Sequence, residues 1–142
     1  MKILIAADAS PWTKPMISYV TGHRDWFGAG HEYTVFTVVR ALPTHVAVMA
    51  EGGPDAIHRY YNKEAEKVFE PIRAAFAQVG IPARWEGRVG APAEQIAEMA
   101  EAGKFDVVVM GARGHGAIGG LLAGSVSTKV LATCKVPVLL IR

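Results

Sequence analysis

Short runs rich in apolar, β-branched and aromatic residues recur along the chain, separated by longer stretches with a helical pattern. The first run, residues 2–7 (KILIAA), is continuously apolar after its lysine, which is typical of a strand buried on both faces of a sheet. A more polar run at residues 83–89 also predicts a strand. The remaining strands are predicted at residues 32–40, 105–111 and 137–142.

The longest predicted helix begins at Asp55 and ends before Gly80. Its apolar side chains recur at intervals of three and four residues as far as Val79, which gives the helix one apolar face. Pro71 lies inside this stretch, so we expect it to kink or split the helix. The aromatic residues expected in the core are Tyr60, Tyr61, Phe69 and Phe76.

Three further helices are predicted between the strands. The first is capped by Asp8 or Ser10 and runs to about Trp26. The others lie within residues 90–103 and at residues 125–134. Residues 41–54 show no clear period and are expected to form a loop, in which residues 45–50 either pair weakly or pack over a neighbour.

Because strands and helices alternate, the sequence predicts an α/β fold with parallel strands and right-handed crossovers. The length of 142 residues suits a single domain spanning residues 1–142. We therefore expect one open, doubly wound, five-stranded sheet with helices on both faces.

Composition narrows the class of protein. The chain has 15 Lys and Arg against 13 Asp and Glu, which argues against a nucleic-acid-binding protein. No apolar run approaches the ~20 residues of a membrane span, and the run ILIAA near the N-terminus is too short for a signal peptide. Cys134 is the only cysteine, so we expect a reducing, cytoplasmic setting and a buried thiol.

The stretch GARGHGAIGGLLAGSVS, residues 111–127, predicts an anion site. It leaves the carboxyl end of the fourth strand and ends at the start of the last helix, where unpaired N–H groups favour phosphate. Its glycines let the backbone approach a ligand closely. No acidic residue follows Asp106, so nothing in this part of the chain repels a phosphate.

Two common phosphate motifs do not explain this stretch. Gly119 and Gly124 have the Walker A spacing, but Ser125 stands where that motif needs a lysine. Gly114, Gly116 and Gly119 match the dinucleotide pattern, yet no acid follows about 20 residues later.

A third pattern fits better. Gly111, Gly114, Gly124 and Ser125 have the spacing G-2x-G-9x-G-S, which resembles the signature of the universal stress protein family. The segments ADAS, VGAPAEQIAEMA, DVVVMGARGHG and GSVSTKVLATCKVPVLLIR are similar to other parts of that family, so the resemblance spans nearly the whole chain.

The resemblance implies a site for ATP. Glycine and hydroxyl groups of the loop would hold the phosphates, Asp8 would reach the ribose or adenine, and Val38 would pack on the base. To these we add Arg113, whose guanidinium is suited to pairing with a phosphate. The nucleotide-binding residues expected are Ala6, Ala7, Asp8, Val38, Met110, Gly111, Arg113, Gly114, Gly124, Ser125, Val126 and Ser127.

The chain departs from the family pattern at two positions. Ala9 replaces the glycine of the family's DGS turn, and Arg40 stands where an acid is common. Asp8 has the alternative role of capping the first helix only. The five histidines show no metal-ligand spacing, and His115 is interpreted as a solvent-facing loop residue.

The function that the resemblance implies is that of an ATP-binding, dimeric regulatory protein of the stress response. The alternatives are a slow ATPase or autophosphorylating enzyme on the same site, and a nucleotide-free interaction protein. No catalytic or metal-ligating residue is assigned, and any Mg or Mn ion would bind through the phosphates. With the strand order 3-2-1-4-5, the strand from Val136 to Arg142 lies at an edge and is expected to form a homodimer.

Overall fold

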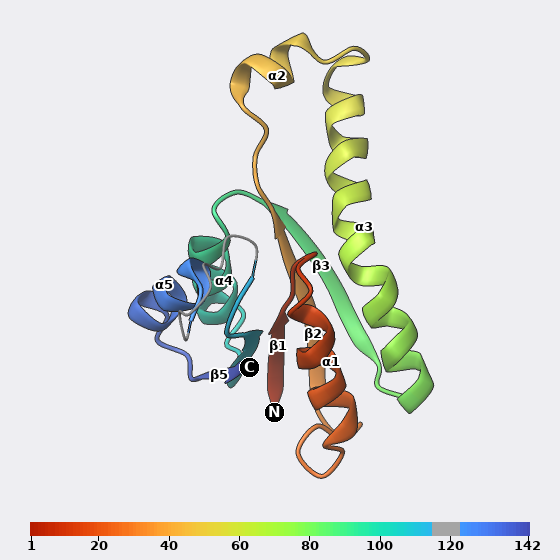
Figure 1. Cartoon of the computed structure of the whole chain (residues 1–142), viewed down its shortest axis with the longest axis vertical. Coiled ribbons are helices and arrows are strands. Elements are labelled where there is room, and N and C mark those ends of the chain that lie inside the picture. Colours follow the sequence, from red (N-terminus) through yellow and green to blue (C-terminus); the bar gives the residue numbers. More distant parts are fainter. Residues whose placement is uncertain (115–122) are drawn as a thin grey trace.

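The computed structural model describes residues 1–114 and 123–142 of the chain. Within these residues the strands form one five-stranded parallel sheet in the order β3-β2-β1-β4-β5, which confirms the predicted fold class and strand order (Figure 1). The strands are β1 (Lys2–Ala6), β2 (Glu32–Val39), β3 (Ala83–Val89), β4 (Val107–Gly111) and β5 (Val138–Ile141). The helices are α1 (Thr13–Gly22), α2 (Thr44–Met49), α3 (Gly53–Val79), α4 (Pro92–Ala102) and α5 (Ser125–Thr133).

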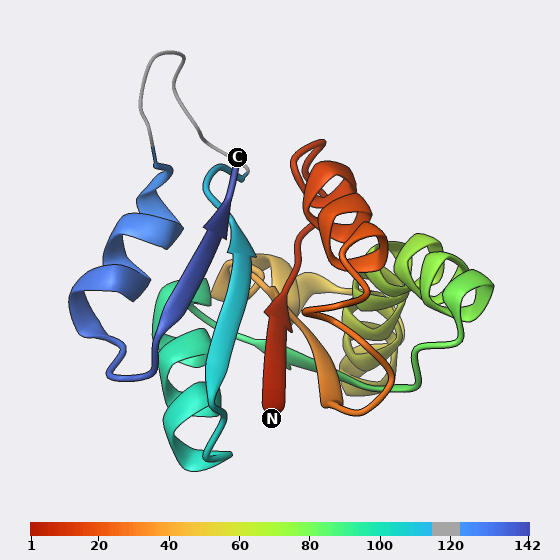
Figure 2. The same cartoon turned by 90° about the horizontal axis from the view of Figure 1, so that it is seen from below.

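The central strand β1 is apolar because both of its faces are covered. Ile3, Leu4 and Ile5 are fully buried, and they alternate between two separate apolar clusters, one on each face of the sheet. Helices α1 and α3 cover one face, and α4 and α5 cover the other (Figure 2). The two layers of helices explain why β1 shows no alternation of polar and apolar residues.

The register of the sheet brings three strand ends together. Ala6 of β1 is paired with Phe36 of β2 on one side and with Met110 of β4 on the other. The chain winds from β1 toward β2 and β3 in one direction, and toward β5 from β4 in the opposite direction. In open parallel sheets, ligands bind at such a reversal, at the carboxyl ends of the strands.

The first helix is shorter than predicted. It ends at Gly22 rather than at about Trp26, and the His23 N–H donates a hydrogen bond to the Tyr19 carbonyl. The chain then turns, because the N–H groups of both Trp26 and Phe27 bond to the His23 carbonyl. This turn lets Phe27 reach the core, where it is buried.

Residues 41–54 are not entirely a loop, since they contain the six-residue helix α2. None of its residues is buried, and a segment this short has too few turns to display a helical period. The helix lies beside the N-terminal part of α3, away from the sheet (Figure 1).

Three smaller expectations also need correction. Helix α3 is one continuous helix, so Pro71 does not split it, and a kink at this residue stays a prediction. Phe69 and Phe76 are buried, but Tyr60 is exposed and Tyr61 is only partly buried. Cys134 is likewise partly buried at the edge of the cluster under α4 and α5. In the parts of the chain that the structure describes, no helix has both the length and the apolar character needed to cross a bilayer.

Candidate functional site

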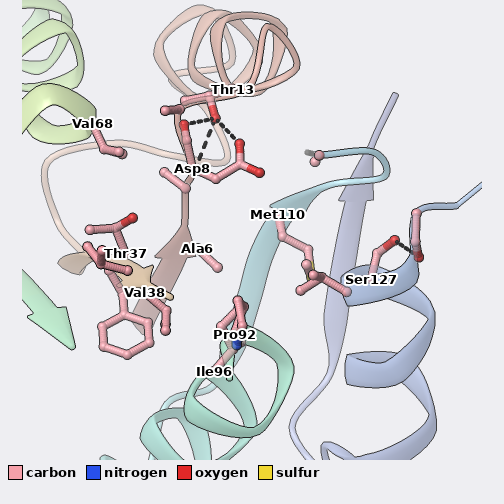
Figure 3. A pocket seen from close by; sticks show the side chains of 18 of the residues that line it. Ala6, Asp8, Thr13, Thr37, Val38, Val68, Pro92, Ile96, Met110 and Ser127 are labelled. Carbon is pink, nitrogen blue, oxygen red and sulfur yellow. Dashed lines mark hydrogen bonds between the residues drawn. The ribbon is translucent and has the colours of Figure 1, made fainter. Parts of the chain in front are cut away.

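A cavity of about 290 Å³ lies at the carboxyl ends of β1, β2 and β4 (Figure 3). It is bordered by the turn after β1, the start of α5, and side chains from α3 and α4. The structure brings every residue predicted for the site to this cavity: Ala6, Ala7, Asp8, Val38, Met110, Gly111, Arg113, Gly114, Gly124, Ser125, Val126 and Ser127. Their contacts with a ligand stay a prediction.

One wall of the cavity is the N-terminus of α5. Gly124 is the N-cap residue in an extended conformation, and no side chain caps the helix among the described residues. The first intrahelical hydrogen bond runs from the Thr128 N–H to the Gly124 carbonyl at 3.0 Å. The N–H groups of the preceding residues in the first turn therefore have no intrahelical acceptor and give this wall a partial positive charge.

Ser127 links the start of α5 to the residue after β4 by hydrogen bonds. The residue is only 2% exposed, and its Oγ lies 2.8 Å from the Ala112 carbonyl oxygen and 3.0 Å from that of Gly124. The Gly124 N–H also donates to the Ala112 carbonyl, at 2.6 Å. The Ser127 hydroxyl hydrogen is therefore used within the protein.

Asp8 organises the turn after β1. Its Oδ1 accepts hydrogen bonds from the Ser10 N–H at 3.0 Å and from the Thr13 hydroxyl at 3.1 Å. Neither Asp8 nor Ser10 caps α1, which begins only at Thr13 with Trp12 as its N-cap residue. The capping role expected for Asp8 is thus wrong, because an extra turn, closed by the bond from the Thr13 N–H to the Ser10 carbonyl, separates it from the helix.

Arg113 stacks on an aromatic ring at the rim of the cavity. Its guanidinium carbon lies 5.0 Å from the centroid of the Trp12 ring, a cation–π arrangement. Trp12 is partly exposed, so the pair lies at the surface. The stack holds a positive charge beside the loop that carries Gly111 and Gly114.

The remaining lining comes from several elements. Ala6 comes from β1, Val38 from β2 and Met110 from β4, and residues of α3 and α4 that the sequence analysis did not select join them. The additional lining residues are Thr13, Phe36, Thr37, Val39, Glu64, Val68, Pro92 and Ile96, with Ala9 and Arg40. Two signals for these residues were present in the sequence, since Thr37 directly precedes Val38, and Pro92 and Ile96 lie in the family-like segment VGAPAEQIAEMA. Glu64 and Val68 of α3 reach the cavity only through tertiary packing.

Several predicted features concern residues outside the description. Gly116, Gly119 and His115 belong to residues 115–122, so their positions are not described. Among residues 1–114 and 123–142, no cluster of three or more His, Cys, Asp or Glu side chains is arranged to hold a metal ion.

Comparisons with known proteins agree on one family. The model of the universal stress protein family matches residues 1–142. A universal stress protein of Thermus aquaticus, encoded in the 3′ region of a QAH/OAS sulfhydrylase, is 36% identical over 147 residues, covering 99% of this chain and 97% of its own. Universal stress protein MJ0531 of Methanocaldococcus jannaschii is 27% identical over 141 residues, covering 99% of this chain and 81% of its own.

Solved structures share the fold. The protein MJ0577 superposes with a TM-score of 0.78 at 24% identity, covering 99% of this chain and 94% of its own. An Arabidopsis thaliana universal stress family protein with AMP bound superposes with a TM-score of 0.70 at 16% identity, covering 99% of this chain and 90% of its own. A universal stress protein in complex with cAMP superposes with a TM-score of 0.69 at 18% identity, covering 100% of this chain and 97% of its own. With a family match along its whole length, the chain belongs to the universal stress protein family.

Proposed function

We propose that this protein binds an adenine nucleotide, ATP, in the cavity at the carboxyl ends of β1, β2 and β4. The observation that carries the proposal is the convergence of four separate parts of the sequence, around residues 6–8, 38, 110–114 and 124–127, on one cavity. Two proteins with the same fold have AMP or cAMP bound, which supports a nucleotide of this class.

The phosphates would lie at the end of the cavity formed by α5 and the glycines. A Cβ atom added to Gly124 would lie 3.5 Å from both the Gly114 nitrogen and the Arg113 Cα, so two backbone segments approach each other there with no side chain between them. Together with the uncapped start of α5, this cradle suits an anion. Ser125 supplies a hydroxyl, and Arg113 supplies a full positive charge at the rim.

The adenosine part would lie toward β1 and β2. Ala6 and Val38 would provide apolar contacts for the base, Met110 of β4 would lie near the ribose, and Asp8, between β2 and β4 in Figure 3, would reach the ribose or the base. Asp8, which lines the cavity and lies against Gly114, could contribute a carboxylate to a Mg or Mn ion bound through the phosphates.

The site favours binding over turnover. In the described part of the lining, the carboxylates belong to Asp8 and Glu64. Asp8 is bonded to Ser10 and Thr13, and Glu64 lies 2.6 Å from the Lys67 ammonium group. Phosphoryl transfer requires a positioned nucleophile and metal-binding carboxylates. We therefore propose a regulatory protein of the stress response that acts as a switch in the cytoplasm, rather than an efficient ATPase.

The proposed switch is a homodimer formed through the strand from Val136 to Arg142. Strand β5 lies at the edge of the sheet, so one side of its backbone has no strand partner in the described chain. Val138, Leu139 and Leu140 are apolar and only partly buried. Pairing of β5 with the same strand of a second copy would cover these groups.

The proposal is tested by identifying what the purified protein carries. Heat denaturation followed by mass spectrometry of the released small molecules should yield ATP or another adenine nucleotide. Phosphate release under excess ATP should then be very slow, and rapid release would favour the ATPase alternative. A protein that carries no nucleotide and takes none up from ATP solution would support the nucleotide-free alternative.

A further inference from the structure

Thr37 is a buried residue whose hydroxyl has no hydrogen-bond partner among residues 1–114 and 123–142. It is 2% exposed and lines the cavity. Its oxygen is not one of the fully buried side-chain atoms without a partner, so it is open to the cavity that Thr37 lines. A hydroxyl held at a cavity wall with no partner among the described residues is free to bond to a ligand atom as donor or acceptor.

The sheet holds Thr37 rigidly in this position. It is paired with Gly87 in the ladder between β2 and β3, and a Cβ atom added to Gly87 would lie 3.9 Å from its methyl group. Figure 3 shows the side chain on the Val68 side of β2, across the strand from Pro92 and Ile96. As a β-branched residue in the middle of a sheet, Thr37 has little freedom to turn its hydroxyl elsewhere.

Thr37 lies at the end of the cavity opposite the phosphate cradle. The cradle belongs to β4 and α5, whereas Thr37 belongs to β2, and β1 lies between β2 and β4 in the sheet. A nucleotide whose phosphates meet the start of α5 would extend its base across Ala6 toward β2. We infer that the Thr37 hydroxyl forms a hydrogen bond with the base of the bound nucleotide, an inference that rests on the proposed function.

Two substitutions and one control test this inference. Thr37→Val replaces the hydroxyl with a methyl group of similar size, and Thr37→Ser keeps the hydroxyl. Thr34→Val makes the same change in the same strand, at a residue that is 7% exposed and does not line the cavity. The dissociation constants for ATP and for inorganic tripolyphosphate are measured by titration calorimetry for all variants.

Thr37→Val should weaken ATP binding by roughly three- to tenfold, the usual effect of one lost hydrogen bond. Tripolyphosphate, which has no base, should bind as it does to the parent, and both Thr37→Ser and Thr34→Val should retain most of the affinity for ATP. Thr37→Val should leave the urea midpoint of the free protein unchanged or higher, since the hydroxyl bonds to no residue in the described part of the chain.

Three results would overturn the inference while leaving the proposed function intact. These are parental ATP affinity in Thr37→Val, an equal loss of ATP affinity in Thr34→Val, and an equal loss of tripolyphosphate affinity in Thr37→Val. A parent protein that binds no ATP would instead overturn the proposed function itself, and the inference with it.

Discussion

The Asp8 carboxylate lies against the backbone of Gly114, so closely that a Cβ atom added to Gly114 would be 2.5 Å from Oδ2. Asp8 cannot turn away without loss, because its Oδ1 accepts hydrogen bonds from Ser10 and Thr13. The turn after β1 and the loop after β4 are thus in direct contact, and a side chain at position 114 would force the carboxylate or the loop to shift.

Gly114→Ala should therefore weaken ATP binding by about tenfold, or ~1.4 kcal/mol. The new methyl group must displace either the carboxylate or the loop, and both belong to the proposed site. Overpacking of this kind should also lower the free energy of unfolding, by about 1–3 kcal/mol. Gly30→Ala is the control, because a Cβ atom there meets nothing within 4 Å. Equal affinities in calorimetry for the parent and Gly114→Ala would show that this contact does not shape the site.

Ser125→Asp should weaken ATP binding at least tenfold, ~1.4 kcal/mol, because the new carboxylate would face the phosphates. The fold should not suffer, since an acidic residue in the first turn of a helix is favourable. Thr128→Asp is a matched control in the same helix, exposed and outside the cavity lining. If Ser125→Asp binds ATP as the parent does, the phosphates do not lie at the start of α5.

Leu139→Lys should shift the proposed dimer toward monomer. Leu139 is partly buried at the edge strand, and a charge there opposes pairing with a second copy. Leu131→Lys is the control, since Leu131 is 50% exposed on α5. Sedimentation velocity at micromolar concentration gives the mass, and circular dichroism checks the fold. A monomeric parent, or a fully stable Leu139→Lys dimer, would exclude this interface.

Residues 41–54 should exchange their amide hydrogens rapidly in the free protein and more slowly with saturating ATP. The helix α2 in this segment has no buried residue, and Gly52 and Gly53 after it both have positive φ, at 90° and 65°. The segment follows β2, whose last residues line the cavity. Hydrogen exchange followed by mass spectrometry checks this prediction. Exchange rates of residues 41–54 that are the same with and without ATP would argue against ordering of this segment by the ligand.

Much of the fold was predictable because its signals are local. The apolar run of β1, the period of α3 and the glycine after it each report one element, and their alternation determines the class of fold. The end of α1 could not be predicted from the sequence, because it depends on Phe27 turning into the core. Helix α2 was missed because its six residues bury nothing.

The predicted site residues could also be found from local signals, since most of them lie in contiguous motifs at strand ends. Glu64 and Val68 carry no such motif, and only the packing of α3 against the sheet brings them to the cavity. The role of the Ser127 hydroxyl was also hidden, because its acceptor on Ala112 is 15 residues away in the sequence.

The central claim is that one cavity of this chain holds ATP, and titration calorimetry of the nucleotide-stripped protein with ATP tests it most directly. We predict saturable binding of one ATP per chain, competition by AMP for the same site, and loss of at least tenfold in affinity in Ser125→Asp. An absence of saturable binding, or ATP binding that AMP does not compete with and Ser125→Asp does not weaken, would contradict the account.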